Sequence, residues 1–148
     1  VYLKKPMSSS ELGQSIRSAE AFLNRMEAYA LSGEEGLALT ELNAFRKTRV
    51  IGYTDVNLSG QALLDEIRLE RRKELCFEGH RWFDLRRQGM PEIKHTYKAE
   101  KGGAVYEYVL QQGDPMYTLP FPNSVVLQNR GLVQNPSREM GARQGEIQ

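Results

Sequence analysis

Residues 63–89 read LLDEIRLERRKELCFEGHRWFDLRRQG, and this stretch decides the fold because it puts charged residues where a helix normally has its apolar stripe. Side chains three or four positions apart lie on one face of a helix. Followed at that spacing, one face consists of Leu64, Ile67, Arg71, Glu74, Glu78, Arg81 and Leu85. The two ends of this face are apolar, and its middle is charged.

Large apolar residues surround the charged middle, which is typical of a buried helix. These neighbours are Leu75, Cys76, Phe77, Trp82 and Phe83. Buried charges must be paired, because an isolated one costs several kcal/mol. Arg71 can pair with Glu74 or Glu78 at this spacing. Arg81 can pair with Glu78 or Asp84. We therefore expect one long helix over residues 59–89, with a structural ion network formed by Arg71, Glu74, Glu78, Arg81 and Asp84.

Part of this stretch resembles a known family. Residues 70–89, ERRKELCFEGHRWFDLRRQG, are similar to the signature helix of the SusD/RagB family, surface lipoproteins of Bacteroidetes that bind glycans or other nutrients. Residues 117–122, YTLPFP, and 134–136, QNP, resemble the Pro-rich strand and the Gln-Asn-Pro ending of the family. The chain departs from the family pattern by continuing through residues 137–148. The resemblance covers residues 17–136.

Length and composition are those of a soluble globular domain. The chain has 148 residues, of which 40% are hydrophobic and 26% charged, and its net charge of +1 argues against nucleic acid or an anionic membrane surface as partner. No stretch approaches the roughly 18–20 apolar residues of a membrane span. The chain begins with Val1 and shows no signal peptide, and members of the family are several times longer. We therefore expect residues 1–148 to be the C-terminal part of a SusD/RagB-like domain.

A helix pair is expected over residues 8–49. Three serines at 8–10 offer N-caps, and an apolar stripe at helical spacing then continues to Ala30. This stripe contains Leu12, Ile16, Ala19, Leu23 and Met26, and Phe22 and Tyr29 widen it. Ser32 and Gly33 end the first helix, and the second covers residues 34–49. The pair resembles a tetratricopeptide unit with Met26 where a small residue is usual, and such a pair needs neighbours to bury its faces.

The rest of the chain predicts a small β element. Gly79 is a point where the long helix can kink, and residues 89–91, GMP, end it. Residues 105–110 alternate as a strand does, and 116–121 are a second candidate strand joined to them by a turn at 111–115. We expect a hairpin and extended segment over 105–136 and a polar tail with a mobile end over 137–148. The predicted fold is mostly α, with a tetratricopeptide-like helix pair, a long helix and a small C-terminal β-hairpin.

The sequence gives only weak evidence for catalytic or metal-binding residues. Glu78 and Asp84 lie within two turns of one helix, among arginines that keep them ionised, whereas glycosidase carboxylates face each other across a cleft. His80 and His95 are too few for a typical metal site. Cys76 is expected to be a small buried thiol. We therefore predict no catalytic residues, no metal and no cofactor.

Aromatic residues matter if the whole protein binds sugar, because rings stack on the apolar faces of pyranoses. Trp82 lies in the signature segment and is expected in the core. More accessible candidates fall at loop or edge positions, namely Tyr53, Tyr97, Tyr106 and Tyr108. In the family, most glycan-binding residues lie upstream of the part that this chain resembles, so we assign no ligand-binding residues.

The resemblance implies a function without catalysis. It implies binding of nutrient glycans, such as starch or other oligosaccharides, at the bacterial outer membrane for uptake through a SusC-type TonB-dependent transporter. The whole protein would be lipid-anchored, and this chain would be mainly scaffold. The alternative is a tetratricopeptide-type protein–protein adaptor, which the helix pair by itself would support.

Overall fold

The computed structural model of the chain describes residues 17–139 and 145–147. It divides into two compact units, one that ends at Arg81 and one that begins at Trp82. Most of the regular structure in the described residues is helical, and a small antiparallel sheet of three strands completes it. The predicted fold class is therefore confirmed.

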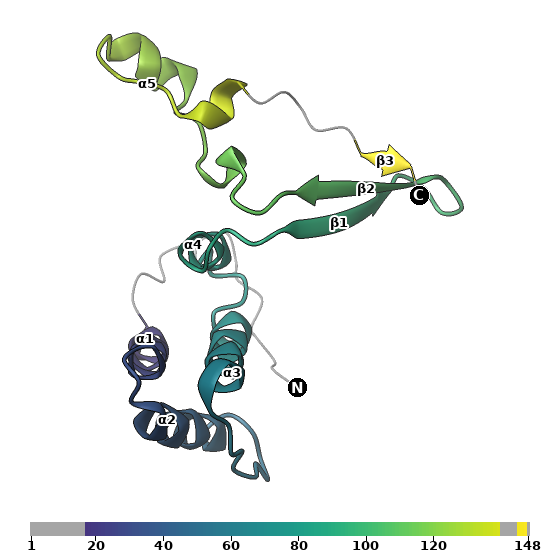
Figure 1. Cartoon of the computed structure of the whole chain (residues 1–148). Coiled ribbons are helices and arrows are strands. Elements are labelled where there is room, and N and C mark those ends of the chain that lie inside the picture. The colour runs from purple at the N-terminus through teal and green to yellow at the C-terminus, as the bar shows by residue number, and fades with distance from the viewer. Residues whose placement is uncertain (1–16, 140–144, 148) are drawn as a thin grey trace. The chain divides into compact units, whose positions relative to one another are not determined.

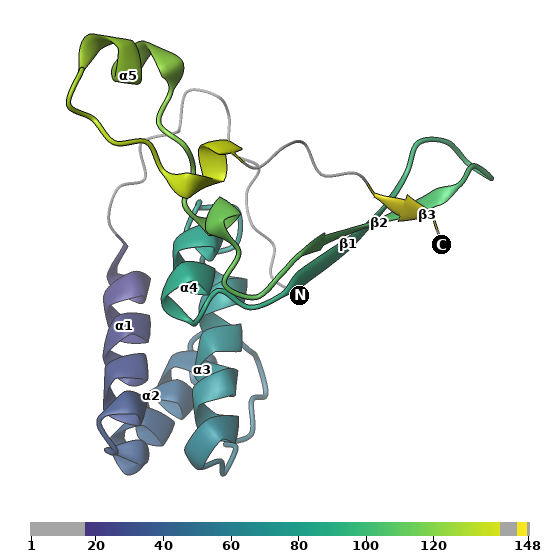
Figure 2. The ribbon, with the colours of Figure 1, turned by 45° about the horizontal axis from the view of Figure 1, so that its top comes forward.

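The first unit is built from three helices, α1 (Ser18–Leu31), α2 (Glu35–Lys47) and α3 (Gly60–Glu74), which pack together in Figures 1 and 2. Their apolar stripes meet in one core, because each helix has too little apolar surface to be stable alone. This core consists of Ala19, Leu23, Met26, Ala38, Leu42, Phe45, Leu63, Ile67 and Leu75. The stripe predicted for the first helix of the pair supplies Ala19, Leu23 and Met26.

The helix pair turns sharply between α1 and α2. Gly33 has a φ of 86°, a left-handed conformation that favours glycine at the end of a helix. Met26 is fully buried between the helices, so the large side chain fills the place where a small one is usual. The expected beginning of the first helix, with its capping serines and with Leu12 and Ile16, lies outside the described residues.

A contact between helices stabilises the start of α3. Ser59 is the N-cap residue, as the sequence indicates, but its side chain makes no capping hydrogen bond. The backbone N–H of Gly60 instead donates to Oε2 of Glu35 at 3.0 Å. A carboxylate is favourable there because a helix N-terminus carries partial positive charge. The beginning of α2 therefore caps the beginning of α3.

The single long helix predicted over 59–89 is wrong. α3 ends at Glu74 and α4 begins at Arg81, with a turn between them. Phe77 and Gly79 adopt left-handed φ values of 65° and 82°, which no helix can include. The turn directs Phe77 to solvent, with 88% of it exposed. Cys76 is exposed as well, so its predicted burial is also wrong.

The second unit contains α4 (Arg81–Arg87), most of which lies beyond the division at Arg81, and the sheet of β1 (Ile93–Lys98), β2 (Val105–Leu110) and β3 (Glu146–Ile147). Figure 1 shows the long β1–β2 hairpin with β3 beside β2. The strand at 105–110 appears as predicted, but its hairpin partner precedes it in sequence. The predicted partner at 116–121 is wrong because a 3-10 turn, η1 (Pro115–Tyr117), occupies its start. Asp114 caps that turn by accepting the N–H of Met116 at 2.8 Å.

Side-chain amides organise the segment that follows. It contains a short helix, α5 (Asn123–Gln128), and a 3-10 turn, η2 (Pro136–Glu139). The amide of Gln134 accepts the N–H of Phe121 at 2.8 Å and donates to its carbonyl at 3.0 Å, as a neighbouring strand would. Asn135 donates to the carbonyl of Leu119 at 2.8 Å. The Gln-Asn-Pro ending thus pairs with the Pro-rich segment by side chains.

The polar tail at 137–148 is more structured than predicted where it is described. Its first residues form the end of η2, with Ser137 buried, and its last described residues form β3. Residues 140–144 and 148, on which the predicted mobility also bears, lie outside the described part of the chain.

Candidate functional site

Charged side chains occupy the buried face of α3. Glu70, Arg71 and Glu74 are only 2%, 5% and 7% exposed. Charges this deep are stable only when each one has a partner. The partners come from α1 and α2, so the charges hold the three helices of the first unit in one arrangement.

Arg46 of α2 is, like Arg71, a nearly buried cation of this network. Its Nε donates to Glu70 at 2.8 Å, and its Nη2 donates to Glu66 at 3.0 Å. Burial alone would lower the pKa of Arg46, but hydrogen bonds with Tyr53, Glu66 and Glu70 and the charge of Glu70 outweigh it, so the pKa is raised. Arg46 therefore keeps its charge inside the unit.

The predicted network residues on α3 reach across to other elements. Arg71 donates to Oδ1 of Asn24 at 2.7 Å, and its Nη2 lies 3.5 Å from Oε1 of Glu20, both on α1. Arg49, two residues beyond the end of α2, pairs with Glu74 at 3.1 Å. The spacing along one helix indicated that these residues needed partners, but it could not reveal partners on other helices.

Arg17 connects the network to the turn after α3. Its guanidinium lies 2.6 Å from Glu74 and 2.5 Å from Glu78, and both carboxylates are almost fully buried. Arg17 is the N-cap residue of α1, and 32% of its side chain is exposed. No local signal could identify these partners, which lie 57 and 61 residues away.

The last two predicted network residues lie around the start of α4. Asp84 is buried and pairs with Arg87 at 3.0 Å, one turn further along the helix. Arg81, in contrast, is exposed. The structure therefore brings Arg71, Glu74 and Glu78 into the first unit's ion network and places Asp84 in the second unit.

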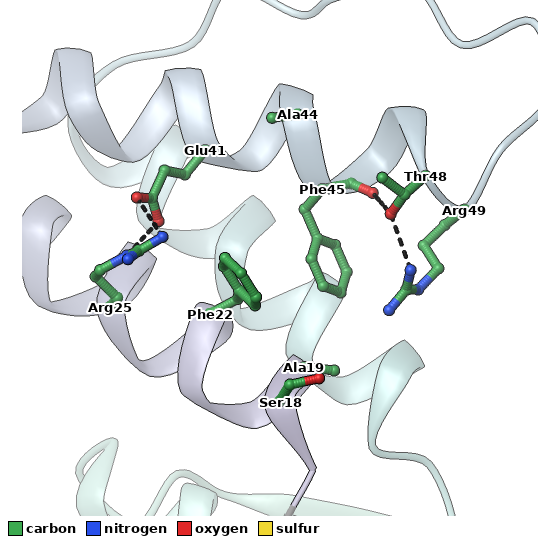
Figure 3. Close-up of a pocket in the computed structure, with 9 residues that line it drawn as sticks. All are labelled: Ser18, Ala19, Phe22, Arg25, Glu41, Ala44, Phe45, Thr48 and Arg49. Carbon is green, nitrogen blue, oxygen red and sulfur yellow. Dashed lines mark hydrogen bonds and ion pairs between the residues drawn. The ribbon is translucent and has the colours of Figure 1, made fainter.

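A shallow apolar groove of about 420 Å³ lies between α1 and α2. Figure 3 shows the rings of Phe22 and Phe45 inside it. Arg25 lies over the ring of Phe22 at 5.0 Å and pairs with Glu41 at 2.8 Å, while Arg49 lies over Phe45 at 4.6 Å. Phe22, which the sequence assigned to the core stripe, is 46% exposed here. The groove is an apolar surface bordered by charge.

A second surface is the aromatic face of the sheet, which we define as Trp82, His95, Tyr97, Tyr106 and Tyr108. Strand side chains alternate, so one face of β1 carries Ile93, His95 and Tyr97. Their partners on β2 are Leu110, Tyr108 and Tyr106. Trp82 joins this face because it lines one cleft of about 210 Å³ with Ile93, His95, Tyr108, Val109 and Leu110.

Two of the predicted aromatic candidates have structural partners. The indole of Trp82 stacks on the ring of Tyr117 at 4.8 Å, and its N–H donates to the Tyr117 carbonyl at 3.2 Å. Trp82 is thus half-buried, less enclosed than expected. Tyr53 lies in the first unit and donates its hydroxyl to Asn43 at 2.8 Å, which assigns it to the scaffold.

Comparison with known proteins identifies the family. The model of the SusD family matches residues 6–137. The chain belongs to the SusD family. A search of curated proteins finds no match to this SusD-family chain.

Two solved structures support the same assignment. One is a SusD-like protein from Bacteroides fragilis, 26% identical, with a TM-score of 0.60 over 82% of this chain and 25% of that chain. The other is a SusD-like carbohydrate binding protein from Bacteroides vulgatus, 25% identical, with a TM-score of 0.53 over 79% and 29%. The chain therefore spans little more than a quarter of the length of these relatives.

The geometry limits what this SusD-family chain can do chemically. The carboxylates of the ion network are occupied by guanidinium groups from neighbouring helices, which is a structural arrangement. The described residues contain no group of three or more His, Cys, Asp or Glu that could hold a metal ion. No described helix is both long and apolar enough to span a bilayer. Within the described residues, the groove and the aromatic face are two surfaces that recognition could use.

Proposed function

We propose that the protein containing this chain captures nutrient glycans at the surface of a bacterial outer membrane, without cleaving them, and passes them to a SusC-type TonB-dependent transporter. The match of the SusD family to residues 6–137 is the observation that carries this proposal. The solved relative from Bacteroides vulgatus, described as carbohydrate binding, supports a glycan as the ligand.

Within that protein, the chain acts mainly as scaffold. Its most enclosed polar groups, such as Arg46 and Glu70, bind each other. The two solved relatives are about three times its length, so we place most of the ligand site in parts that this chain does not contain. Membrane attachment is proposed through a lipid anchor on the whole protein.

The full-length protein provides the test. We expect calorimetric titration with malto-, xylo- and fructo-oligosaccharides to show binding to at least one of them, with no new reducing ends after prolonged incubation. Co-expression with a SusC-type transporter from the same organism should yield a complex that survives purification. A full-length protein that binds none of a broad glycan panel and does not associate with the transporter would contradict the proposal.

The apolar groove favours a second candidate function, a tetratricopeptide-type adaptor. An amphipathic peptide helix could seat one large apolar side chain against Phe22 and Phe45. Selection of displayed peptides on the 148-residue chain separates the two functions. Peptides whose binding is lost in Phe22→Ala but kept in Phe77→Ala, an exposed aromatic outside the groove, would favour the adaptor.

A further inference from the structure

The aromatic face is neutral, although the hairpin that carries it is rich in charge. The charged side chains of β1 and β2 are Lys94, Lys98 and Glu107. Strand alternation places all three on the opposite face of the hairpin. A neutral surface of rings and hydroxyl groups suits a neutral ligand better than an anion such as a nucleic acid.

Gly145 holds the ring of Tyr108 in a defined position. The pairing of β2 with β3 matches Tyr106 with Ile147 and Glu107 with Glu146, so the next opposed pair would be Tyr108 and Gly145. A Cβ on Gly145 would lie 2.8 Å from Cε2 and Cζ of Tyr108 and 2.8 Å from Cβ of Tyr106, too close for two carbon atoms. The ring therefore lies over the glycine backbone, the arrangement known as aromatic rescue of a strand glycine. Tyr108 is still 37% exposed.

Tyr97 and Trp82 complete the aromatic face; the ring of Tyr97 is exposed, and that of Trp82 is held by stacking. Tyr97 is 57% exposed and lies diagonal to Tyr108 across the two strands. Diagonal neighbours lie roughly 7–8 Å apart, so one extended ligand can contact both rings. Trp82 is fixed by its stack on Tyr117 and borders the cleft of about 210 Å³. That volume is below the roughly 300–1,000 Å³ of drug-sized pockets, so it fits one ring-sized unit.

We infer that the aromatic face is a secondary subsite for pyranose units of a neutral oligosaccharide, with Tyr97 and Tyr108 as stacking platforms and His95 as a hydrogen-bond partner in the cleft. This inference rests on the proposed function. A pyranose has an apolar C–H face and a rim of hydroxyl groups, which match an aromatic ring bordered by phenol and imidazole groups. Tyrosine provides this contact area with little loss of side-chain entropy.

The test is titration of the 148-residue chain, followed by proton–nitrogen correlation NMR. The probes are maltohexaose and cellohexaose, built of pyranoses, and an inulin-type fructohexaose, built mainly of furanoses, whose rings lack a flat apolar face. We expect the pyranose probes to bind with a Kd weaker than about 1 mM, because the contact area is small. The shifted signals should belong to β1 and β2, and the fructan should bind more weakly still.

Variants assign the contact to the rings. Tyr97→Ala and Tyr108→Ala should each weaken binding roughly threefold to tenfold, the effect of losing one aromatic contact. Tyr108→Phe should retain most of the affinity because the ring remains. Gly145→Ala should also weaken binding, because the added methyl collides with the ring of Tyr108 and with Cβ of Tyr106. Phe77→Ala, an exposed aromatic outside the sheet, is the matched control and should change nothing.

The outcomes separate this inference from the proposed function. Loss of pyranose binding in Tyr97→Ala and Tyr108→Ala, with the hairpin signals retained, supports the subsite. Absence of binding at saturating probe, equal binding in all variants, or shifts only outside the sheet would overturn it. Glycan binding by the full-length protein would then still support the proposed function, whereas its absence there would contradict that function independently.

Discussion

At the scale of single residues, the chain depends on buried charges whose partners come from distant parts of the sequence. Glu70 is 2% exposed and binds Arg46, which also binds the more accessible Glu66. Removing one member of a buried ion pair is costly because the other charge remains in a poorly solvated place. Surface pairs contribute little, since water solvates either member well.

Glu70→Ala should lower the free energy of unfolding by about 3–5 kcal/mol, because it leaves Arg46 with less counter-charge inside the unit. Glu66→Ala is the matched control, since it removes a carboxylate from the same guanidinium at a site where 32% of the side chain is exposed. Its cost should be about 1 kcal/mol or less. Urea unfolding monitored by circular dichroism measures both values. Equal losses would show that burial of Glu70 is not what makes its pair important.

Removing the side chain of Arg17 should lower the free energy of unfolding more than removing that of Arg81. Arg17→Ala removes the closest cation from two nearly buried carboxylates, Glu74 and Glu78, and should cost about 2–3 kcal/mol. Arg81 is exposed, so Arg81→Ala should cost under about 1 kcal/mol. The same urea experiment compares them. A larger loss for Arg81→Ala would favour the arrangement expected from helical spacing alone.

At the scale of elements, the break between α3 and α4 is the feature that most changes the architecture. The signature segment has the composition of one helix, yet Phe77 and Gly79 turn the backbone left-handed after Leu75. The turn allows Glu78 to meet Arg17, which lies at the start of α1. The break therefore redirects the backbone after α3 and also permits an ion pair of the network.

Gly79→Ala tests the break. A residue with a side chain at φ near 82° is strained by about 1–2 kcal/mol, so this variant should be less stable by that amount although nothing lies within 4 Å of the added Cβ. Gly36→Ala in α2 also adds a Cβ in open space, but in a helix, where it should stabilise by about 0.5–1 kcal/mol. Thermal and urea unfolding of both variants provide the comparison. Stabilisation by Gly79→Ala would mean that the segment becomes helical through the turn.

At the scale of the whole molecule, the chain spans only part of the length of its solved relatives. It covers 25% and 29% of two solved SusD-like proteins, and its own surfaces are shallow. The carboxylates that might suggest glycosidase chemistry are engaged by arginines, Glu78 by Arg17 and Asp84 by Arg87. Each of these two carboxylates therefore has an arginine partner, which favours its ionised form.

We therefore expect no hydrolysis by this chain. Incubation with labelled starch, xylan and fructan oligosaccharides should release no new reducing ends, because neither carboxylate acts as an acid on a bound glycan. Glu78→Gln and Asp84→Asn should give the same result as the unsubstituted chain. Reproducible cleavage that disappears in Glu78→Gln would refute a binding function without catalysis.

The sequence by itself determined the helical class, the helix pair and the strand at 105–110. These features follow from local spacing, which is the same in any folded context: the stripe through Leu23 and Met26, the turn at Gly33 and the alternation of β2. The sequence also indicated that charges on the face of α3 must be buried and paired, because apolar residues surround them. It indicated the family through the twenty residues at 70–89.

Only the tertiary structure decided the partners. Arg17 meets Glu74 and Glu78 across about sixty residues, β2 pairs with the strand before it, and Gly145 comes to lie against Tyr108. Local spacing carries no record of such contacts, because they depend on where other elements bring their side chains. The left-handed turn at Phe77 was likewise decided by the tertiary structure. A phenylalanine gives no local reason for it, and the long-range pairing of Glu78 with Arg17 accompanies it.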